Sequence, residues 1–497
     1  MNIMMLLEMA ASGYGDRVAF FEAESNASIT YQELFDGAGV AANAVLASGA
    51  DRFAMLDVSS LAVPIGLFAS AWAGIPYAPL NYRLTDDEID RLLGRIKPAH
   101  LVTETHRLER FEAQEGVTVR SREKFLDVAR AGGDAAKPWS MDPEATAVLL
   151  FTSGTTGEPK AAVLRHKHLV SYILGSVEFM SAEETEATLV CVPPYHVAGI
   201  AAVLSSVYAG RRVVQLANFS AEAWIDVARA ERVTSAFVVP TMLARIVDCL
   251  ESEQSANMPH LQSLSYGGGK MPLSIITKAM ALFPDTDFTN AYGLTETSST
   301  VTVLGPDEHR AAVQSTDPQE ARRLISVGVP LPGIEIEIRD EAGVPLGPGE
   351  AGEIFVRGEQ VSGEYEGRGS VIDDEGWFPT RDAGYLDADG YLFLGGRADD
   401  VIVRGGENMS PGEIEDVLLE HDAVADAAIV GVPDEQWGEA VAGAVVLTSA
   451  VTVAELQAWV KARMRSSRVP VRIEFWDELP YTETGKLLRR IVKERLS

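Results

Sequence analysis

The sequence is poor in cysteine, in basic residues and in long apolar runs, and each shortage excludes a class of protein. Cys191 and Cys249 are its only cysteines, so a disulfide scaffold is excluded, and no C-x-x-C pair is present for zinc or redox chemistry. We expect both thiols to be buried and structural. No apolar run is long enough to cross a membrane, and residues 1–17 lack the basic flank of a secretory signal and are typical of an amphipathic helix. A cytoplasmic protein is therefore expected.

The shortage of basic residues also limits the partners of the protein. Its 42 lysines and arginines stand against 72 aspartates and glutamates, which gives a formal net charge of −30. A surface of this sign repels nucleic-acid phosphates and anionic lipid headgroups. We expect neither as a partner. The length of 497 residues is too great for one ordinary core and predicts two or more domains.

The first half of the chain alternates helical and strand-like apolar spacing. Thr85 and Glu88 form the pattern of a helix-capping box. The alternation predicts an α/β fold with parallel sheets. The predicted helices are 31–49, 64–75, 85–96, 202–210 and 220–233, and the predicted strands are 52–59, 99–104, 187–194, 212–218, 235–240 and 264–269.

Two later regions have a different texture. Short β-segments separated by turns begin near Val327 and predict a β-rich subdomain over about 327–398. The last hundred residues predict a small α+β domain, whose first helix would open with a capping box of Ser410 and Glu413. We expect an N-terminal domain over 1–398 and a C-terminal domain over 399–497. The C-terminal domain would contain strands 423–433, 439–449 and 470–479 and a helix over 452–464 with a Thr452–Glu455 box.

The most distinctive short segment is "FTSGTTGEPK", residues 151–160. Glycines and hydroxyls in such a loop present N–H and O–H donors in a concave arc that suits an oxyanion, above all phosphate. It is not a Walker P-loop, because Gly154 and Gly157 are too close together and Pro159 precedes Lys160. Composition alone leaves an ordinary surface turn as an equal alternative.

Six motifs in order along the chain resemble those of the adenylate-forming enzymes, a superfamily of acyl- and aryl-CoA ligases, firefly-type luciferases and nonribosomal adenylation domains. Each alone is weak, but together they cover nearly the whole chain, and the likeness is greatest to bacterial acyl- or aryl-CoA ligases. The motifs are the phosphate loop at 152–160, "PPYHVAG" (193–199), "YGGGKMP" (266–272), "AYGLTET" (291–297), "PTRDAGYLDADGYLFLGGRADDVI" (379–402) and "PYTETGKLLRR" (480–490).

This resemblance implies a reaction in two halves. A carboxylate attacks the α-phosphorus of ATP to give an acyl-adenylate and pyrophosphate, and a nucleophile, usually the thiol of coenzyme A, then displaces AMP. Because an anion must approach a polyanion, the chemistry requires compensating positive charge, including Mg²⁺. ATP, Mg²⁺ and coenzyme A are therefore the expected cofactors and co-substrates.

The resemblance also implies roles for individual residues. Lys486 would bridge the carboxylate and the α-phosphate, Glu296 would hold Mg²⁺, Thr295 would donate to the α-phosphate, and His196 would lie near the substrate or the thiol tunnel. Tyr292 could stack on adenine. The residues implied in nucleotide binding are Thr152, Ser153, Gly154, Thr155, Thr156, Gly157, Lys160, Gly267, Gly268, Gly269, Asn290, Ala291, Tyr292, Gly293, Asp382 and Arg397.

Each of these residues has an ordinary structural alternative. Glu296 and Lys486 are of types that usually lie on a solvated surface, Asp382 and Arg397 could form a surface ion pair of little consequence, and His196 could simply pack. The ordered set of motifs favours function for the first four of these, and favours a site role for His196 more weakly.

One position departs from the family pattern. The family usually has Thr-Gly-Asp where this chain has Arg381 between Thr380 and Asp382. The carboxylate is kept, but a glycine-specific backbone geometry at this position is put in doubt, and the cation could touch phosphates or point to solvent. The resemblance further places a domain hinge at Asp399 and likens residues 403–411 to the loop that lines the pantetheine tunnel.

The substrate is defined only by class. "PYHVAGIAAV" (194–203) lacks the aspartate that binds an amino-acid ammonium group, and its small apolar residues predict a roomy hydrophobic pocket for a fatty, alicyclic or aromatic acid. Coenzyme A is the first acceptor hypothesis, and an amine or a carrier-protein thiol is the second. A non-enzymatic nucleotide-binding protein is a third hypothesis. The oligomeric state stays open.

Overall fold

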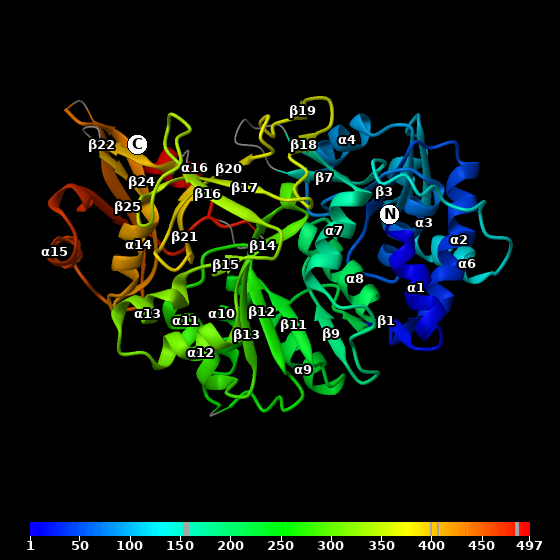
Figure 1. The fold of residues 1–497 in the computed structure, drawn as a ribbon, viewed down its shortest axis with the longest axis horizontal. Coiled ribbons are helices and arrows are strands. Elements are labelled where there is room, and N and C mark those ends of the chain that lie inside the picture. The colour runs from blue at the N-terminus through cyan, green and yellow to red at the C-terminus, as the bar shows by residue number, and fades with distance from the viewer. Residues whose placement is uncertain (153–158, 254, 398–399, 405–406, 435, 483–486) are drawn as a thin grey trace.

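The computed structural model describes residues 1–152, 159–253, 255–397, 400–404, 407–434, 436–482 and 487–497. Figure 1 shows a large lobe that contains two extended sheets and a β-rich sheet, and a small lobe formed by the C-terminal part of the chain. This mixed α/β architecture confirms the predicted fold class.

The larger of the two extended sheets, here called sheet A, has nine strands in the described part of the chain. In spatial order they are β15 (Val329–Pro330), β14 (Ser299–Leu304), β13 (Asp287–Leu294), β12 (Ser263–Gly267), β11 (Ser235–Val238), β9 (Ala187–Val190), β10 (Arg212–Gln215), β1 (Val18–Glu22) and β2 (Ala27–Thr30). The central run from β13 to β1 is parallel, and the edge strands are antiparallel. The carboxyl ends of the parallel strands therefore meet along one edge, where sites in such sheets form.

Sheet B has eight strands among the described residues. In spatial order they are β19 (Gly369–Ser370), β18 (Glu364–Tyr365), β8 (Lys160–Arg165), β7 (Thr146–Thr152), β4 (Tyr77–Pro79), β3 (Arg52–Leu56), β5 (Ala99–Thr103) and β6 (Val117–Ser121). The strands from β7 to β6 pair in parallel, and β7 and β8 form an antiparallel hairpin.

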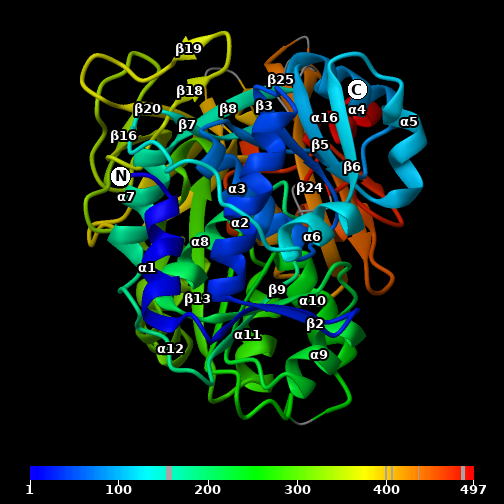
Figure 2. The ribbon, with the colours of Figure 1, turned by 90° about the vertical axis from the view of Figure 1, so that its right-hand side faces the viewer.

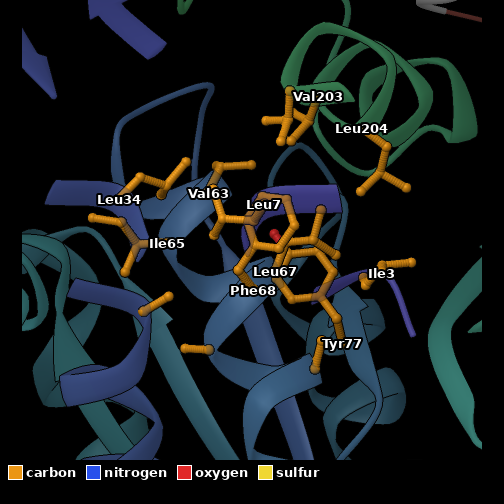
Figure 3. Packing of buried hydrophobic residues seen from close by; sticks show 14 of the residues in the cluster. Ile3, Leu7, Leu34, Val63, Ile65, Leu67, Phe68, Tyr77, Val203 and Leu204 are labelled. Atoms are coloured by element: carbon orange, nitrogen blue, oxygen red, sulfur yellow. The ribbon is translucent and has the colours of Figure 1, made fainter. Parts of the chain in front are cut away.

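Helices from both halves of the large lobe pack between sheets A and B and form its main core. Figure 2 shows this layer end on, with α1 and α2 beside α3 and α8. Figure 3 shows how Leu7, Leu34, Phe68 and Leu204 from four of these helices meet in one apolar cluster. The helices of the layer are α1 (Met4–Tyr14), α2 (Tyr31–Ala47), α3 (Ala62–Ala73), α6 (Arg122–Arg130), α7 (His166–Ser176) and α8 (Val197–Ala209).

Other helices cover the outer faces of the two sheets. Those on sheet A bury a second apolar cluster, and α4 contributes to a third cluster on sheet B. The outer helices are α4 (Asp86–Arg95) and α5 (Leu108–Glu112) on sheet B, and α9 (Ala221–Ala230), α10 (Pro240–Cys249), α11 (Leu273–Leu282), α12 (Pro306–Gln314) and the short α13 (Pro318–Arg322) on sheet A.

The remaining elements form the β-rich sheet and the small lobe. The β-rich sheet has the order β16 (Glu335–Arg339), β17 (Gly352–Arg357), β20 (Phe378–Leu386) and β21 (Leu392–Arg397). The small lobe contains β22 (Ile402–Arg404), β23 (Glu407–Met409), β24 (Val424–Asp434), β25 (Gly438–Leu447), β26 (Arg472–Phe475), α14 (Pro411–Leu419), α15 (Val453–Arg463) and α16 (Arg489–Leu496).

The local sequence signals were correct at most helix starts. The capping boxes at Thr85 and Thr452 are formed. The predicted box at Ser410 is wrong, because its hydroxyl donates to the Gly395 carbonyl and Glu413 pairs with Arg468 instead.

Two further expectations concern the thiols and the membrane. Cys191 is buried as expected, whereas Cys249 is exposed, because it lies at the last position of α10 rather than on its buried face. No helix in the described ranges is long and apolar enough to cross a membrane.

Candidate active site

A cleft of about 1840 Å³ runs between the large and small lobes. The carboxyl ends of β12 and β13, the β20–β21 pair and the α14 helix all contribute to its wall. Lys270 connects the lobes across this wall, since its ammonium donates to the Gly412 carbonyl at 2.9 Å and lies 2.5 Å from Asp416. Described residues of five of the six predicted motifs therefore line this cavity, and the phosphate-loop residues Thr152 and Lys160 are not among them.

The base of the predicted phosphate loop lies in the β7–β8 hairpin. Thr152 and Lys160 pair across it, and the Thr152 hydroxyl donates to the Lys160 carbonyl at 3.4 Å. The Lys160 ammonium lies 5.4 Å from the ring centre of Tyr365, a cation–π contact. The predicted phosphate-binding residues Ser153, Gly154, Thr155, Thr156 and Gly157 lie outside the described residues.

Glu296 is held beside that hairpin by the same tyrosine. The Tyr365 hydroxyl donates to the Glu296 carboxylate at 2.6 Å. Burial, together with the neighbouring carboxylate, raises the pKa of Tyr365, so the hydroxyl stays a donor. Glu296 and Thr295 sit on a short 3₁₀ turn, Thr295–Thr297, directly after β13, and Thr295 lines the cleft. The metal candidate and the base of the phosphate loop are thus joined by Tyr365.

Asp382 and Arg397 face each other across the β20–β21 pair. The Arg397 guanidinium lies 3.1 Å from Asp382, and the Tyr292 hydroxyl donates to the other carboxylate oxygen at 2.8 Å. The Asp382 side chain is only 13% exposed, which excludes a fully solvated surface pair. Burial, reinforced by Asp382, raises the pKa of Tyr292 well above its ordinary value. The ring of Tyr292 packs with Val301 and other apolar residues, and its stacking on adenine stays a prediction.

The backbone at Arg381 keeps a glycine-like conformation although the residue is not glycine. Its φ is +62°, in the left-handed region that costs a residue with a Cβ about 1–2 kcal/mol. Its N–H donates to Glu353 at 3.2 Å, and its guanidinium, with the side chain 64% exposed, lies 3.8 Å from the same carboxylate. The cation therefore points toward Glu353 and solvent.

The glycine-rich turn after β12 lies close against β13. A Cβ on Gly267 would lie 2.1 Å from the Ala291 carbonyl, and Gly268 has a φ of +80°. Both positions therefore require glycine, and Gly268, Gly269, Ala291 and Gly293 line the cleft. Asn290 is nearly buried, and its amide donates to the Ser326 carbonyl at 2.9 Å, which holds the strand in place.

His196 lies at the N-terminus of α8, half-buried, and lines the cleft. Its ring centre is 4.6 Å from that of Tyr195, which packs in turn against Tyr82 at 5.4 Å. The structure therefore places His196 in the cavity, and its chemical role stays a prediction.

Lys486 lies outside the described residues, but the segments on both sides of it do not. Tyr481 and Leu487 form an antiparallel bridge, and both line the cleft. The Tyr481 hydroxyl donates to Asp426 at 2.8 Å. The described residues Tyr481 and Leu487, which flank this segment of the sequence, therefore both lie at the cleft wall.

A buried ion pair anchors the helix that follows Lys486. Arg489 donates to the Glu415 carboxylate through both terminal nitrogens, one of them at 2.8 Å, and lies 3.4 Å from Asp400. Burial acts to raise the pKa of Glu415, but Arg489 outweighs it and holds that pKa below its ordinary value. Glu415 is 4% exposed.

Sequence reasoning missed Tyr365, Lys270, Glu415 and Arg489. Arg489 was visible as part of the terminal motif, but its partner is 74 residues away along the chain. The predicted hinge at Asp399 and part of the predicted 403–411 loop also lie outside the described residues.

The predicted hydrophobic pocket is only half correct. The α8 side of the cleft is apolar and small-residued as expected, whereas the sheet A side presents serines and threonines. The prediction of an apolar pocket came from the 194–203 segment alone. The opposite wall is formed by sheet A, and which of its side chains face the cleft depends on how the strands pair.

The residues present suit a magnesium ion that is shared with a phosphate ligand. The described residues contain no group of three acidic, histidine or cysteine side chains able to enclose a metal alone. Glu296, next to the cleft-lining Thr295, would supply one hard oxygen ligand, and Mg²⁺ in such sites takes one or two carboxylates together with substrate phosphates.

Comparisons with known proteins agree with this geometry. A family model described as AMP-binding enzyme matches residues 7–366, and one described as AMP-binding enzyme C-terminal domain matches residues 413–486. The chain is 33% identical to a feruloyl-CoA synthase from Amycolatopsis sp, over 94% of each protein. It is 31% identical to the fatty acid–[acyl-carrier-protein] ligase ScoC from Streptomyces coeruleorubidus, over 94% of this chain and 92% of that one.

A solved structure extends the likeness to three dimensions. O-succinylbenzoate coenzyme A synthetase (MenE) from Bacillus subtilis, in complex with ATP and magnesium ion, superposes with a TM-score of 0.84 at 28% identity. The match covers 98% of each chain.

Proposed function

The chain belongs to the AMP-binding enzyme family, and we propose that it is an acid–thiol ligase that activates a carboxylic acid with ATP and transfers the acyl group to coenzyme A. The observation that carries the proposal is the convergence of Thr295, Asp382 and Arg397 on one cleft between the lobes, with Glu296 next to Thr295 and linked through Tyr365 to the base of the phosphate loop. The surface ion pair and the plain surface turn do not explain this convergence.

In this proposal the large lobe binds the nucleotide. The N–H and hydroxyl groups of residues 152–160 receive the β- and γ-phosphates, and Lys160 adds a positive charge at the base of that loop. Asp382 accepts from the ribose hydroxyls while Arg397 and Tyr292 hold it in place. Gly268 and Gly269, which line the cleft without side chains, leave the backbone accessible to the base.

The first half-reaction requires that repulsion between two anions be cancelled. Glu296 would hold Mg²⁺, which when bound neutralises triphosphate charge and polarises the phosphoryl oxygens. Thr295 donates toward the α-phosphate, and Lys486 bridges it to the attacking carboxylate. Removal of water from the cleft strengthens each of these interactions.

The second half-reaction needs Lys486 to leave and the thiol to enter. We propose a C-terminal domain over 399–497 that turns about Asp399, as the resemblance implies. Among the described residues, the polar contacts that such a turn would break include Lys270 to Gly412 and Asp416, and the Ser410 hydroxyl to the Gly395 carbonyl. Interfaces of this kind are suited to domain movement.

The test is pyrophosphate release from ATP with a panel of fatty, alicyclic and aromatic acids, with and without coenzyme A. We expect acid-dependent release, and AMP and acyl-CoA formation only when coenzyme A is present. If every acid is silent while ATP still binds, the protein is a nucleotide-binding member of the family without this activity.

A second acceptor is favoured by one comparison. The similarity to a ligase of acyl-carrier protein over 94% of this chain supports a carrier thiol as an alternative to coenzyme A. Acyl transfer to a phosphopantetheinyl carrier, or to an amine, with no acyl-CoA formed would favour this alternative.

A further inference from the structure

The inner face of sheet A, which is turned toward α8, carries two cross-strand rows of side chains where the cleft extends under that helix. Register places Thr188, Ser235 and Ser263 side by side on β9, β11 and β12. The next row toward the carboxyl ends contains Ser265 and Thr289, together with Phe237. All of these side chains line the cleft.

Hydroxyls are unexpected on this face. Strands of parallel sheets that are covered on both faces are usually continuously apolar. The opposite face of the same strands follows that rule, since Leu189, Leu264 and Phe288 pack under the outer helices. The row of hydroxyls is therefore a feature of the cavity and not of the fold.

These hydroxyls are left without partners inside the protein. The Ser235 hydroxyl is a buried oxygen with no hydrogen-bond partner. Among the described residues, no side-chain hydrogen bond is formed by Ser263, Ser265, Thr289 or Thr188 either. Buried polar groups are nearly always paired, and leaving one unpaired costs free energy. This penalty applies to the Ser235 hydroxyl, whereas Thr188, Ser263, Ser265 and Thr289 are partly exposed. The missing partners are therefore expected to come from whatever fills the cavity.

Helix α8 forms the wall of the cleft opposite these strands. α8 contacts both β9 and β14 and so bridges the strands between them. It turns Ala198, Ala201, Ala202 and Ser205 toward the cleft, a spacing that places small side chains on one helical face. The groove is apolar on the helix side and hydroxyl-lined on the sheet side.

The groove is also long. We call the row of Thr188, Ser235 and Ser263 the deep row, because it lies at the amino ends of the strands, away from the nucleotide end at Gly267. Ser263 and Gly267 are four residues apart on β12, which at about 3.3 Å per residue separates the two ends by about 13 Å. Arg211, which lines the cleft, already pairs with Glu186 at 3.1 Å, and Asp287, the cross-strand neighbour of Ser263, is bonded to Arg310. The groove therefore suits a long tail with neutral hydrogen-bonding groups.

On the premise of the proposed function, we propose that the acid activated in this cleft carries a neutral polar group, such as a hydroxyl, carbonyl or amide, at the far end of its tail, where Ser235 and Ser263 hydrogen-bond it. An unsubstituted aliphatic chain would leave these hydroxyls unpaired. The two serines act as specificity-determining residues and take no part in the chemistry.

The test compares decanoate with 10-hydroxydecanoate, which differ by one terminal hydroxyl. Dissociation constants are measured by calorimetry with AMP present, so that turnover is not needed. We expect 10-hydroxydecanoate to bind about tenfold more tightly, the factor that one well-formed hydrogen bond can supply. Equal or tighter binding of decanoate, or no binding of either acid, would overturn the inference.

Variants of the deep row provide the second arm. In Ser235→Ala/Ser263→Ala we expect 10-hydroxydecanoate to lose this advantage, while butanoate, which is too short to reach the row, keeps its affinity and reports an intact fold. Ser274→Ala, an exposed serine on α11, is the matched control and should change neither. If the double variant keeps the tenfold preference, the assignment of the two serines is wrong.

Pyrophosphate release, measured separately with ATP, tells the two hypotheses apart. Selective binding of 10-hydroxydecanoate without pyrophosphate release would refute the proposed function and leave this inference standing. Pyrophosphate release with decanoate preferred over 10-hydroxydecanoate would support the proposed function and refute this inference.

Discussion

The two faces of sheet A differ in what they do for the molecule. On the outer face, Leu264, Phe288 and their neighbours form a closed apolar cluster with α9, α10 and α11. On the inner face, the same strands present Ser263, Ser265 and Thr289 to an open cleft. One face stabilises the fold and the other has side chains available to a ligand, so the exceptions to the apolar pattern mark the site.

Sheet B offers a second comparison, in which buried polar side chains lie outside the described wall of the inter-lobe cleft. His100 and Tyr77 flank Phe53 on adjacent strands, with ring centres 5.7 Å and 5.8 Å from it. Neither ring nitrogen of His100 nor the hydroxyl of Tyr77 has a hydrogen-bond partner. Here we expect the polar groups to affect stability and its pH dependence rather than ligand binding.

Removing a large side chain from the outer face gives the largest expected effect. Phe288 is 2% exposed, so Phe288→Ala should lower the free energy of unfolding by about 3–5 kcal/mol. The measurement is urea unfolding, together with pyrophosphate release per folded molecule, which should not change. Phe179→Ala, at a 38% exposed position, is the control and should have a much smaller effect. A selective loss of activity in Phe288→Ala would contradict the division between the faces.

A substitution in the predicted metal site should have the opposite effect, lowering pyrophosphate release while the free energy of unfolding is kept. Glu296→Gln keeps the shape of the side chain but removes the charge that would bind the metal, so pyrophosphate release should fall by about 10²- to 10³-fold. The urea midpoint should stay close to that of the parent protein. Glu112→Gln, an exposed glutamate on α5, is the matched control. Full activity in Glu296→Gln would remove this residue from the site.

The buried His100 of sheet B should make the free energy of unfolding depend on pH. Burial lowers the pKa of His100 from its ordinary value of 6.5 to about 4. The unfolded state therefore binds an extra proton between these values, and the free energy of unfolding falls as the pH is lowered from 6.5 to 4. His100→Leu should make this decline shallower by about 1.4 kcal/mol per pH unit.

The measurement is urea unfolding at several pH values across this range. His260→Gln, on an exposed segment, is the control and should leave the slope unchanged. The buried His166 and His168, whose pKa values are also lowered to about 4 by burial, would account for the part of the slope that remains. An unchanged slope in His100→Leu would show that its ring does not remain neutral.

The smallest effect is expected at Arg381. Arg381→Gly relieves the strain of a positive φ but increases the freedom of the unfolded chain, so the free energy of unfolding should rise by only about 0.5–1 kcal/mol. Arg381→Ala keeps the strain and removes the cation, and should not be stabilised. Stabilisation of the alanine variant instead would mean that the guanidinium, and not the backbone, carries the cost.

The sequence predicted the elements well and the contacts between them poorly. The alternation of β- and α-type spacing predicted sheets A and B, and the ordered motifs named several residues that line the cleft, among them Thr295, Asp382 and Arg397. The Glu296–Tyr365 contact joins residues 69 positions apart, and no local pattern encodes it. The serines of β11 and β12 alternate visibly with apolar residues, but which face they occupy depends on the register and on α8. The positive φ at Arg381 could not be predicted, because neighbouring strands impose it against the preference of the residue.

The most direct test of the account is acid-dependent pyrophosphate release from ATP and magnesium, before any thiol is added. The account predicts release that requires a carboxylic acid and disappears in Lys486→Ala while ATP binding persists. Release at the parental rate in Lys486→Ala, or ATP binding with no release for any acid, would contradict the claim that this cleft activates a carboxylate at phosphorus.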